Sequence, residues 1–306
     1  MPERAPSRPP PDDEPTITAH ELLAPTLRDL LARVRAAAAR VSVTAAAPPA
    51  GASAGYDAEA VHDLRVALRR LRTLLRPARA IYGKQRIGAV ADELRRFAQA
   101  TGIVRDEEVL HETLRELSLP RRTRRALDAW IRSRARHERE LRKAAVDFLM
   151  NGAEAAANPS LEAALTALEA SVRPRRKGQQ SAALLARSAL DAAIEGVRAS
   201  GAAAPRATDP AAMHALRIRE KRLRYTAELF AEVLPSESSR LAKDAARMQK
   251  RLGELHDLDQ AIVVVLQARN LPRPTRPAVI QALRAERAAL AERLQGDLAA
   301  TIAVES

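Results

Sequence analysis

The chain repeats itself along its length, and this repeat limits the folds that its 306 residues can adopt. The segment VHDLRVALRRLR at residues 61–72 aligns with MHALRIREKRLR at residues 213–224, an offset of 152 residues. A second segment, ATGIVRDEEVL at 100–110, aligns with RLGELHDLDQA at 251–261 at an offset of 151 residues. Two segments repeated in the same order with the same separation indicate an internal duplication. We therefore expect two similar structural halves.

Both halves are predicted to be helical. Ala, Leu, Arg and Glu dominate the sequence and favour helix, whereas aromatic residues make up only 2% of the chain. No series of strand-like segments is present, so the predicted fold class is all-α. Breaks fall at Pro48–Gly55 and Asn158–Pro159, and Asp57 is the expected N-cap of a long helix. The expected helices cover about residues 18–43, 57–81, 85–101, 105–117, 121–150, 161–172, 180–199, 209–234, 237–253, 256–269 and 275–302.

The domain organisation follows from these breaks. Residues 1–15 contain six prolines and are predicted to be disordered. The helical domain occupies residues 16–306. Its first half covers about 16–150, a linker region covers about 151–179, and the second half covers about 180–306.

A row of basic residues lies beside the apolar stripe of each motif helix. At about 100° per residue, the leucines of residues 61–75 form one narrow sector, and the basic row begins only about 20° away. The row of the first copy is His62, Arg65, Arg69, Arg72 and Arg76. The row of the second copy is His214, Arg217, Lys221 and Arg224. Like charges at this spacing repel, costing a few tenths of a kcal/mol per pair, so their repetition in both copies favours a binding surface over a solvated face.

A ligand with closely spaced negative charges suits these rows. The chain has a formal net charge of +13, and most of its 51 basic residues are arginine. Arg presents a planar fork of donors to phosphate oxygens, whereas Lys offers a point charge. The histidine that opens each row can donate to phosphate, more strongly when protonated, so affinity should rise as pH falls. The alternative for both histidines is a structural role at the helix start.

Several other classes of protein are disfavoured. The chain has no cysteine, which excludes disulfides, cysteine-ligated zinc and thiol catalysis. The amino-terminal residues lack the apolar region of a secretory signal, and no stretch of about 18 apolar residues could span a membrane. We expect a cytoplasmic protein with no membrane partner.

The paired motifs match the pattern of a known family. HxxRxxxRRxR occupies residues 62–72, and HxxRIxxKRLRY occupies residues 214–225. TGIVRD at 101–106 and LGELHD at 252–257 extend the match. On these residues the sequence resembles the CHAD family, the conserved histidine α-helical domains.

The resemblance implies two antiparallel four-helix bundles related by a pseudo-two-fold axis, with the basic rows lining a shared groove. It also implies non-enzymatic binding of inorganic polyphosphate, often at polyphosphate granules, with no cofactor and no catalytic residue. By position, the ligand-facing residues would be His62, Arg65, Arg69, Arg72, His214, Arg217, Lys221 and Arg224, together with Arg70, Arg76 and Arg222. Weaker candidates, from a softer match between residues 135–140 and 283–288, are Arg136, Arg139, Arg284 and Arg287. Members of the family are often fused to a triphosphate-tunnel domain, but no ExExK signature for one occurs here.

The first competing hypothesis is a di-iron or di-manganese carboxylate enzyme. Glu59-x-x-His62 and Glu108-x-x-His111 have the spacing that such helical metal sites use. The second copy breaks the pattern, because Ala211 stands where Glu59 would be. The neighbouring arginines would also oppose a bound cation.

The second competing hypothesis is a nucleic-acid-binding module. Basic helices can contact phosphates without reading bases. However, aromatic side chains that could stack on bases are scarce, and no known DNA-binding motif is present. A phosphate polymer without bases fits this composition better, so nucleic acid remains a secondary partner.

Overall fold

The structure, a computed structural model, describes residues 17–45, 59–152, 159–173, 176–203 and 209–304. The regular elements of this part are helices, and one isolated antiparallel bridge joins Thr18 to Ser181. The prediction of an all-α fold is therefore confirmed. No helix among these residues is both long and apolar enough to cross a membrane.

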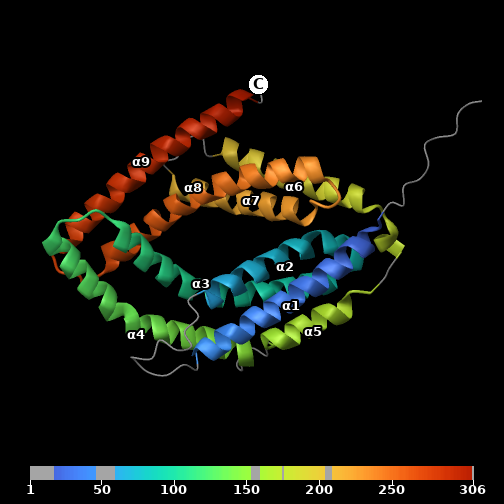
Figure 1. Cartoon of the computed structure of the whole chain (residues 1–306), viewed down its shortest axis with the longest axis horizontal. Helices are drawn as coiled ribbons and strands as arrows, with labels where there is room; N and C mark the ends of the chain where they lie inside the picture. The colour runs from blue at the N-terminus through green and yellow to red at the C-terminus, as the bar shows by residue number, and fades with distance from the viewer. Residues whose placement is uncertain (1–16, 46–58, 153–158, 174–175, 204–208, 305–306) are drawn as a thin grey trace, which may run out of the picture.

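The helices follow one another in the same order in both halves (Figure 1). The first half contains α1 (Ala19–Ala45), α2 (Ala60–Tyr82), α3 (Lys84–Glu116) and α4 (Arg121–Asn151). The connecting region contains α5 (Leu161–Ser171) and a 3₁₀ turn, η2 (Arg176–Gln179). The second half contains α6 (Ala182–Ala202), α7 (Pro210–Leu229), α8 (Pro235–Gln267) and α9 (Thr275–Val304).

Two predicted helix breaks are absent. The sequence predicted interruptions near Gly102 and Gly253, but α3 and α8 run through both glycines without a break. A glycine inside a helix costs only about 0.5–1 kcal/mol relative to alanine, so the packing of a long helix tolerates it. At Gly102 the missing Cβ has a use, because a Cβ there would lie 2.9 Å from Nη1 of Arg65.

The ends of the motif helices differ in detail from the prediction. Asp57, the expected N-cap of α2, lies outside the described residues. In the second copy Asp209 caps α7, since its carboxylate accepts a hydrogen bond of 2.9 Å from the backbone N–H of Ala211. Pro210 then occupies the first turn, where its missing N–H costs nothing. α7 ends at Leu229, five residues before the predicted end at 234.

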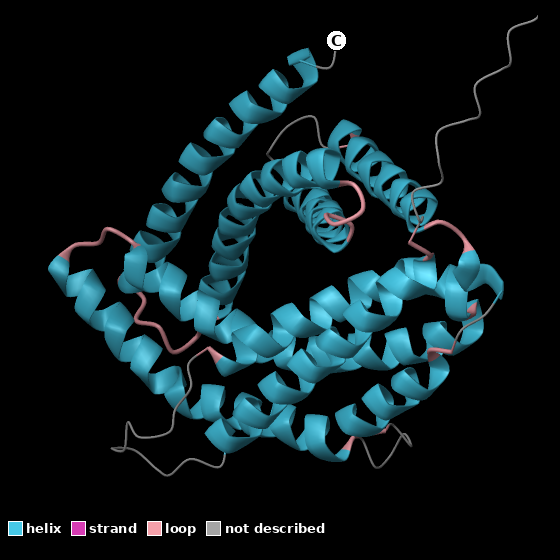
Figure 2. Cartoon of the chain, turned by 45° about the vertical axis from the view of Figure 1, so that its right-hand side comes forward, coloured by secondary structure: helices cyan, strands magenta, loops and turns pink. Residues whose placement is uncertain are grey.

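Each helix packs against its counterpart in the other half. α1 contacts α6, α2 contacts α7, α3 contacts α8 and α4 contacts α9. In the first half α1 also packs on α4, so the four helices close around one core; in the second half α6–α9 pack in chain order. Figures 1 and 2 show the first half and the second half as two groups of helices that lie side by side.

Apolar contacts join the two halves at two places. One cluster combines buried residues of α3 and α4, such as Leu114 and Leu127, with buried residues of α8 and α9, such as Val265 and Leu283. At the other place, Phe230 at the end of α7 is fully buried in the core of the first half. The space between these contacts is where the two motif helices, α2 and α7, face each other.

Candidate anion-binding cleft

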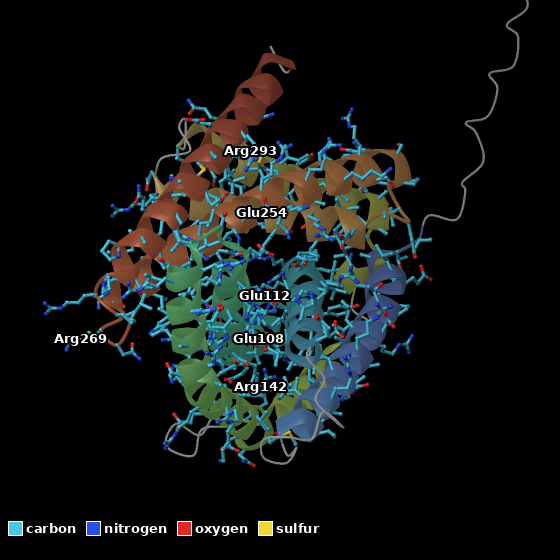
Figure 3. All side chains as sticks on the ribbon, turned by 60° about the vertical axis from the view of Figure 1, so that its left-hand side comes forward. Glu108, Glu112, Arg142, Glu254, Arg269 and Arg293 are labelled. Carbon is cyan, nitrogen blue, oxygen red and sulfur yellow. The ribbon has the colours of Figure 1, made fainter. Side chains whose placement is uncertain are left out.

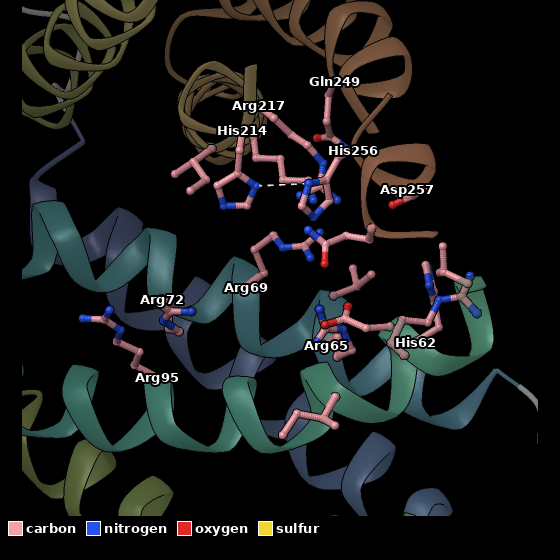
Figure 4. A pocket seen from close by; sticks show the side chains of 18 of the residues that line it. His62, Arg65, Arg69, Arg72, Arg95, His214, Arg217, Gln249, His256 and Asp257 are labelled. Carbon is pink, nitrogen blue, oxygen red and sulfur yellow. Dashed lines mark hydrogen bonds between the residues drawn. The ribbon is translucent and has the colours of Figure 1, made fainter. Parts of the chain in front are cut away.

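A cleft of about 950 Å³ lies between the halves, and we call it the cleft throughout (Figure 4). Its lining comes mainly from α2, α3, α7 and α8. Four carboxylates and four histidines line it beside ten basic side chains. The ten are Arg65, Arg69, Arg72, Arg76, Arg79, Arg95, Arg105, Arg217, Lys221 and Arg222.

Most of the predicted site residues line this cleft. The structure brings together His62, Arg65, Arg69, Arg72, Arg76, His214, Arg217, Lys221 and Arg222. They come from opposite halves of the chain, 152 residues apart in the repeat, and meet because α2 packs on α7. The offset of the basic row beside the core stripe therefore directs it into the space between the halves.

Arg70 and Arg224 are predicted site residues that do not line the cleft. Both bind Glu228 of α7: Arg70 Nη2 lies 3.2 Å from Oε2, and Arg224 Nε lies 2.7 Å from Oε1. Glu228 stands where the first copy has Arg76. The substitution thus turns a point of repulsion into an ionic contact between α2 and α7.

The four weaker candidates lie elsewhere. Arg136 pairs with Glu140 on its own helix, and Arg287 pairs with Asp259 of α8. Arg139 is exposed on α4, and Arg284 borders a separate small pocket. Their positions give no reason to include them in the cleft.

Sequence reasoning missed several lining residues. Arg79 continues the three-and-four spacing of the first row beyond Arg76, so its omission was avoidable. Arg95 and Arg105 reach the cleft from α3, where they belong to no row, and only the packing of α3 beside α2 reveals them. Gln249 and His256 likewise enter from α8.

A glycine lies beside the second basic residue of each row. Arg65 rests against Gly102 and donates a hydrogen bond of 3.1 Å from Nη1 to the carbonyl of Ala98. Its repeat counterpart, Arg217, has its Nε 3.9 Å from the position of a Cβ on Gly253. Both halves therefore place a glycine beside this arginine, but the contact is tight only between Arg65 and Gly102.

Burial weakens the protonation of both arginines, and a repeated aspartate opposes it. Desolvation lowers the pKa of Arg65, while the charge of Asp106 raises it. Desolvation also lowers the pKa of Arg217, and Asp257 opposes the shift. Among the described residues, Nε of Arg217 has no hydrogen-bond partner. Arg217 is thus held in the cleft with fewer hydrogen-bond partners than its donors require.

Tyr225 connects the two rows. Arg69 Nη1 donates a hydrogen bond of 3.2 Å to the Tyr225 hydroxyl, and the guanidinium carbon lies 5.7 Å from the ring centre. Arg224 contacts the same ring, with its guanidinium carbon 5.4 Å from the centre. Tyr225 is only 6% exposed, so it positions Arg69 and has little free surface of its own.

His214 and His256 lie side by side on the second-half side of the cleft (Figure 4), and Lys221 lines the same side. The Nδ1 atoms of His214 and His256 lie 3.4 Å apart, and the ring centres are 4.6 Å apart. Desolvation, with the positive charge of Arg217, lowers the pKa of His214 and lowers that of His256 to about 4. Desolvation and the arginines around Lys221 lower its pKa to about 6. At neutral pH these three groups are therefore largely uncharged.

Glu108, one of the two carboxylates of the metal-site hypothesis, is bound by arginines. Glu108 accepts from Arg142 at 2.7 Å and from Arg105 at 3.2 Å, and Figure 3 shows Glu108 and Arg142 close together. His111 Nε2 lies 3.1 Å from Oε1 of Glu107, which also binds Arg134. Within the described residues, no group of three or more His, Asp or Glu side chains is arranged to hold a metal ion.

Fold and cleft together define a class: all-helical proteins made of two repeated halves with basic residues of both halves in one cleft. The CHAD domain family model matches residues 35–266. The chain therefore belongs to the CHAD domain family.

Relatives and a solved structure agree with this assignment. The uncharacterized proteins MT2285 and Rv2226, from two strains of Mycobacterium tuberculosis, are each 32% identical to the chain over 217 residues. The match covers 65% of this chain and 38% of each relative, so the chain spans well under half the length of these relatives. The crystal structure of the CHAD domain from the plant Ricinus communis superposes with a TM-score of 0.71. It is 23% identical, with 93% of each chain covered, which supports the fold.

Proposed function

We propose that the protein binds inorganic polyphosphate in the cleft and does not convert it chemically. The observation that carries the proposal is the lining of ten basic side chains against four carboxylates, contributed by both halves. Membership of the CHAD domain family supports the choice of polyphosphate. Association with polyphosphate granules in the cytoplasm forms part of the same proposal.

Binding would be driven by charge. The arginines supply planar donor forks to successive phosphate groups, and each neutralised phosphate releases condensed counterions. The desolvated guanidinium groups of Arg65 and Arg217 gain most, because few protein partners compensate for their burial. The free energy of binding therefore depends on salt more than on buried area.

Charge reversal within the cleft tests the proposal. Arg72 and Arg76 line the cleft, and no ion pair holds either of them in the described structure. We expect the double variant Arg72→Glu and Arg76→Glu to weaken polyphosphate binding at least about tenfold, because each reversal replaces an attraction by a repulsion. Fluorescence titration with polyphosphate of defined length would measure the change.

A matched control separates the cleft from net charge. Arg122 and Arg125 are exposed on α4 and do not line the cleft. The variant Arg122→Glu and Arg125→Glu changes the net charge by the same amount and should bind nearly as well as the wild type. Equal losses in the two double variants would place binding outside the cleft.

Nucleic acid is the main alternative ligand, and the cleft offers little to recognise bases. Apart from the histidines, Tyr225 is the one aromatic residue among the described lining residues, and it is buried between Arg69 and Arg224. Base stacking needs an exposed aromatic face. In a competition assay, polyphosphate should displace single-stranded DNA from the protein at a far lower phosphate concentration than DNA needs to displace polyphosphate. Equal affinity per phosphate would favour a general polyanion-binding protein.

A further inference from the structure

One lysine of the chain differs in its surroundings from the rest. The sequence contains six lysines. Lys221 of α7 is half-buried and lines the cleft. The other five are exposed and do not line it: Lys84, Lys143, Lys177, Lys243 and Lys250. They supply an internal set of controls for the chemistry of Lys221.

The amine of Lys221 lies among positive groups of α2 and α7 and beside titratable groups of α8. No carboxylate of the described residues forms an ion pair with it. The charged and titratable groups that face it are Arg65 and Arg69 of α2, His214 and Arg217 of α7, and His256 and Asp257 of α8. Only Asp257 favours the ammonium form. The position combines a lysine nitrogen with several guanidinium groups that can hold a phosphate.

These surroundings make the amine a nucleophile near neutral pH. Burial and the neighbouring arginines lower the pKa of Lys221 to about 6, so most molecules carry a free amine at pH 7.4. An ordinary lysine is deprotonated in only about one molecule in a thousand at that pH. The lower basicity also reduces the intrinsic reactivity of the amine, so the gain in acylation rate is smaller than the gain in the fraction of free amine.

We propose that Lys221 is a modification site for small acyl phosphates, whose phosphate group binds to the guanidinium groups of Arg65, Arg69 and Arg217. This inference rests on the proposed ability of the cleft to hold phosphate. The side-chain nitrogen attacks the carbonyl carbon, and a C–N bond forms. The bond between that carbon and the phosphate oxygen breaks, and inorganic phosphate leaves with the electron pair. The proton lost by nitrogen ends on the released phosphate, so the reaction needs no further reactant.

Acylation of Lys221 should weaken polyphosphate binding in the cleft. The amide that forms carries no charge at any physiological pH, so Lys221 can no longer be protonated when a polyanion enters. The acyl group also occupies space beside Arg69 and Arg217. Acylated protein should therefore bind polyphosphate more weakly than unmodified protein.

The test measures the acylation of every lysine in one sample. Wild-type protein is incubated with acetyl phosphate at pH 7.4, and mass spectrometry of proteolytic peptides gives the initial rate at each lysine. A parallel sample receives an acetylating ester without phosphate, and a third receives acetyl phosphate with excess tripolyphosphate. Polyphosphate binding is measured separately on the same preparation.

We expect Lys221 to react faster with acetyl phosphate than the mean of the five exposed lysines, because more of its amine is free. Tripolyphosphate should suppress this excess at Lys221 and leave the exposed lysines unchanged. With the phosphate-free ester the preference for Lys221 should be smaller.

The inference is overturned if Lys221 reacts no faster than the exposed lysines, or if its excess is the same for both reagents and insensitive to tripolyphosphate. Intact polyphosphate binding in that sample would show that the proposed function survives. Absence of polyphosphate binding, with Lys221 still preferred by the phosphate-free ester alone, would instead reject the phosphate-binding role of the cleft.

Discussion

The basic residues of the cleft differ in their contacts and in their protonation, because the fold buries them to different extents. Arg72 and Arg76 reach the cleft without ion-pair partners, whereas Arg65 is held by Gly102 and the carbonyl of Ala98. Partial burial and the neighbouring arginines lower the pKa of Lys221 to about 6, so this side chain loses most of its charge at neutral pH. The sequence predicted that these residues share a surface, because their spacing is visible. It could not predict their protonation, which depends on the arginines that the other half brings near.

Polyphosphate affinity should depend on pH through Lys221. The free protein has a Lys221 pKa of about 6, below the ordinary value of 10.5, and a bound polyanion raises this pKa by favouring the ammonium. Binding therefore takes up a proton, so affinity should rise as pH falls from 8 and level off only below about pH 6, the pKa of Lys221 in the free protein. We expect an increase of about three- to tenfold in the association constant, measured by calorimetry at the two pH values.

The variant Lys221→Met provides the control for this dependence. It removes the titrating amine and keeps an apolar stem of similar length. At pH 6 the variant should bind polyphosphate more weakly than the wild type does. Its affinity at pH 6 should be nearly the same as its own affinity at pH 8. An unchanged pH dependence in this variant would assign the effect to other groups, such as His214.

Two of the helices that line the cleft, α3 and α8, are long and contain internal glycines. At the level of the element, these two helices are where the prediction from the sequence was wrong. The repeat and the helix-forming composition predicted the order of the helices. The predicted helices ended at residues 101 and 253, beside Gly102 and at Gly253, and glycine is common just after a helix end. Their role is visible only across the interface between helices, where Arg65 lies against Gly102.

Two glycines of α3 should respond differently to alanine. Nothing lies within 4 Å of a Cβ placed on Gly88, so Gly88→Ala should stabilise the protein by about 0.5–1 kcal/mol. A Cβ on Gly102 would lie 2.9 Å from Nη1 of Arg65. Gly102→Ala should therefore displace this guanidinium group, lose much of the stabilisation and weaken polyphosphate binding.

Denaturant unfolding and polyphosphate titration of both variants would measure these effects. Gly253→Ala provides a third point, because its Cβ would make an ordinary contact of 3.9 Å with Arg217. It should behave more like Gly88→Ala. Equal stabilisation and unchanged binding in all three variants would contradict the role of Gly102.

At the scale of the whole molecule, the cleft exists because apolar contacts join the two halves at two places and leave a space between them. The first contact is the shared apolar cluster of α3, α4, α8 and α9, and the second is Phe230 packed in the core of the first half. The duplication predicted two halves, but not the apolar contacts between them, which combine Leu110 and Ala261 of the repeated segments with residues outside those segments, such as Phe230. Arg70 and Glu228 add an ionic contact between α2 and α7.

Shortening a buried side chain in the apolar cluster shared by the two halves should destabilise both halves together. Leu283 of α9 is fully buried there, among residues of both halves. We expect Leu283→Ala to lower the free energy of unfolding by about 2–5 kcal/mol. Chemical denaturation followed by circular dichroism should still show a single transition, because the halves unfold together. Two separate transitions in the variant or the wild type would show that the halves are independently stable.

The most direct test of the central claim is a titration with polyphosphate of one defined length at two salt concentrations, such as 50 and 200 mM. If the cleft neutralises several phosphates, the association constant should fall steeply with salt, since each released counterion contributes nearly one to the slope of log K against log salt. The Arg72→Glu and Arg76→Glu variant should show a slope that is lower by about two. A wild-type affinity that does not change with salt, or a slope unaffected by this variant, would contradict the account.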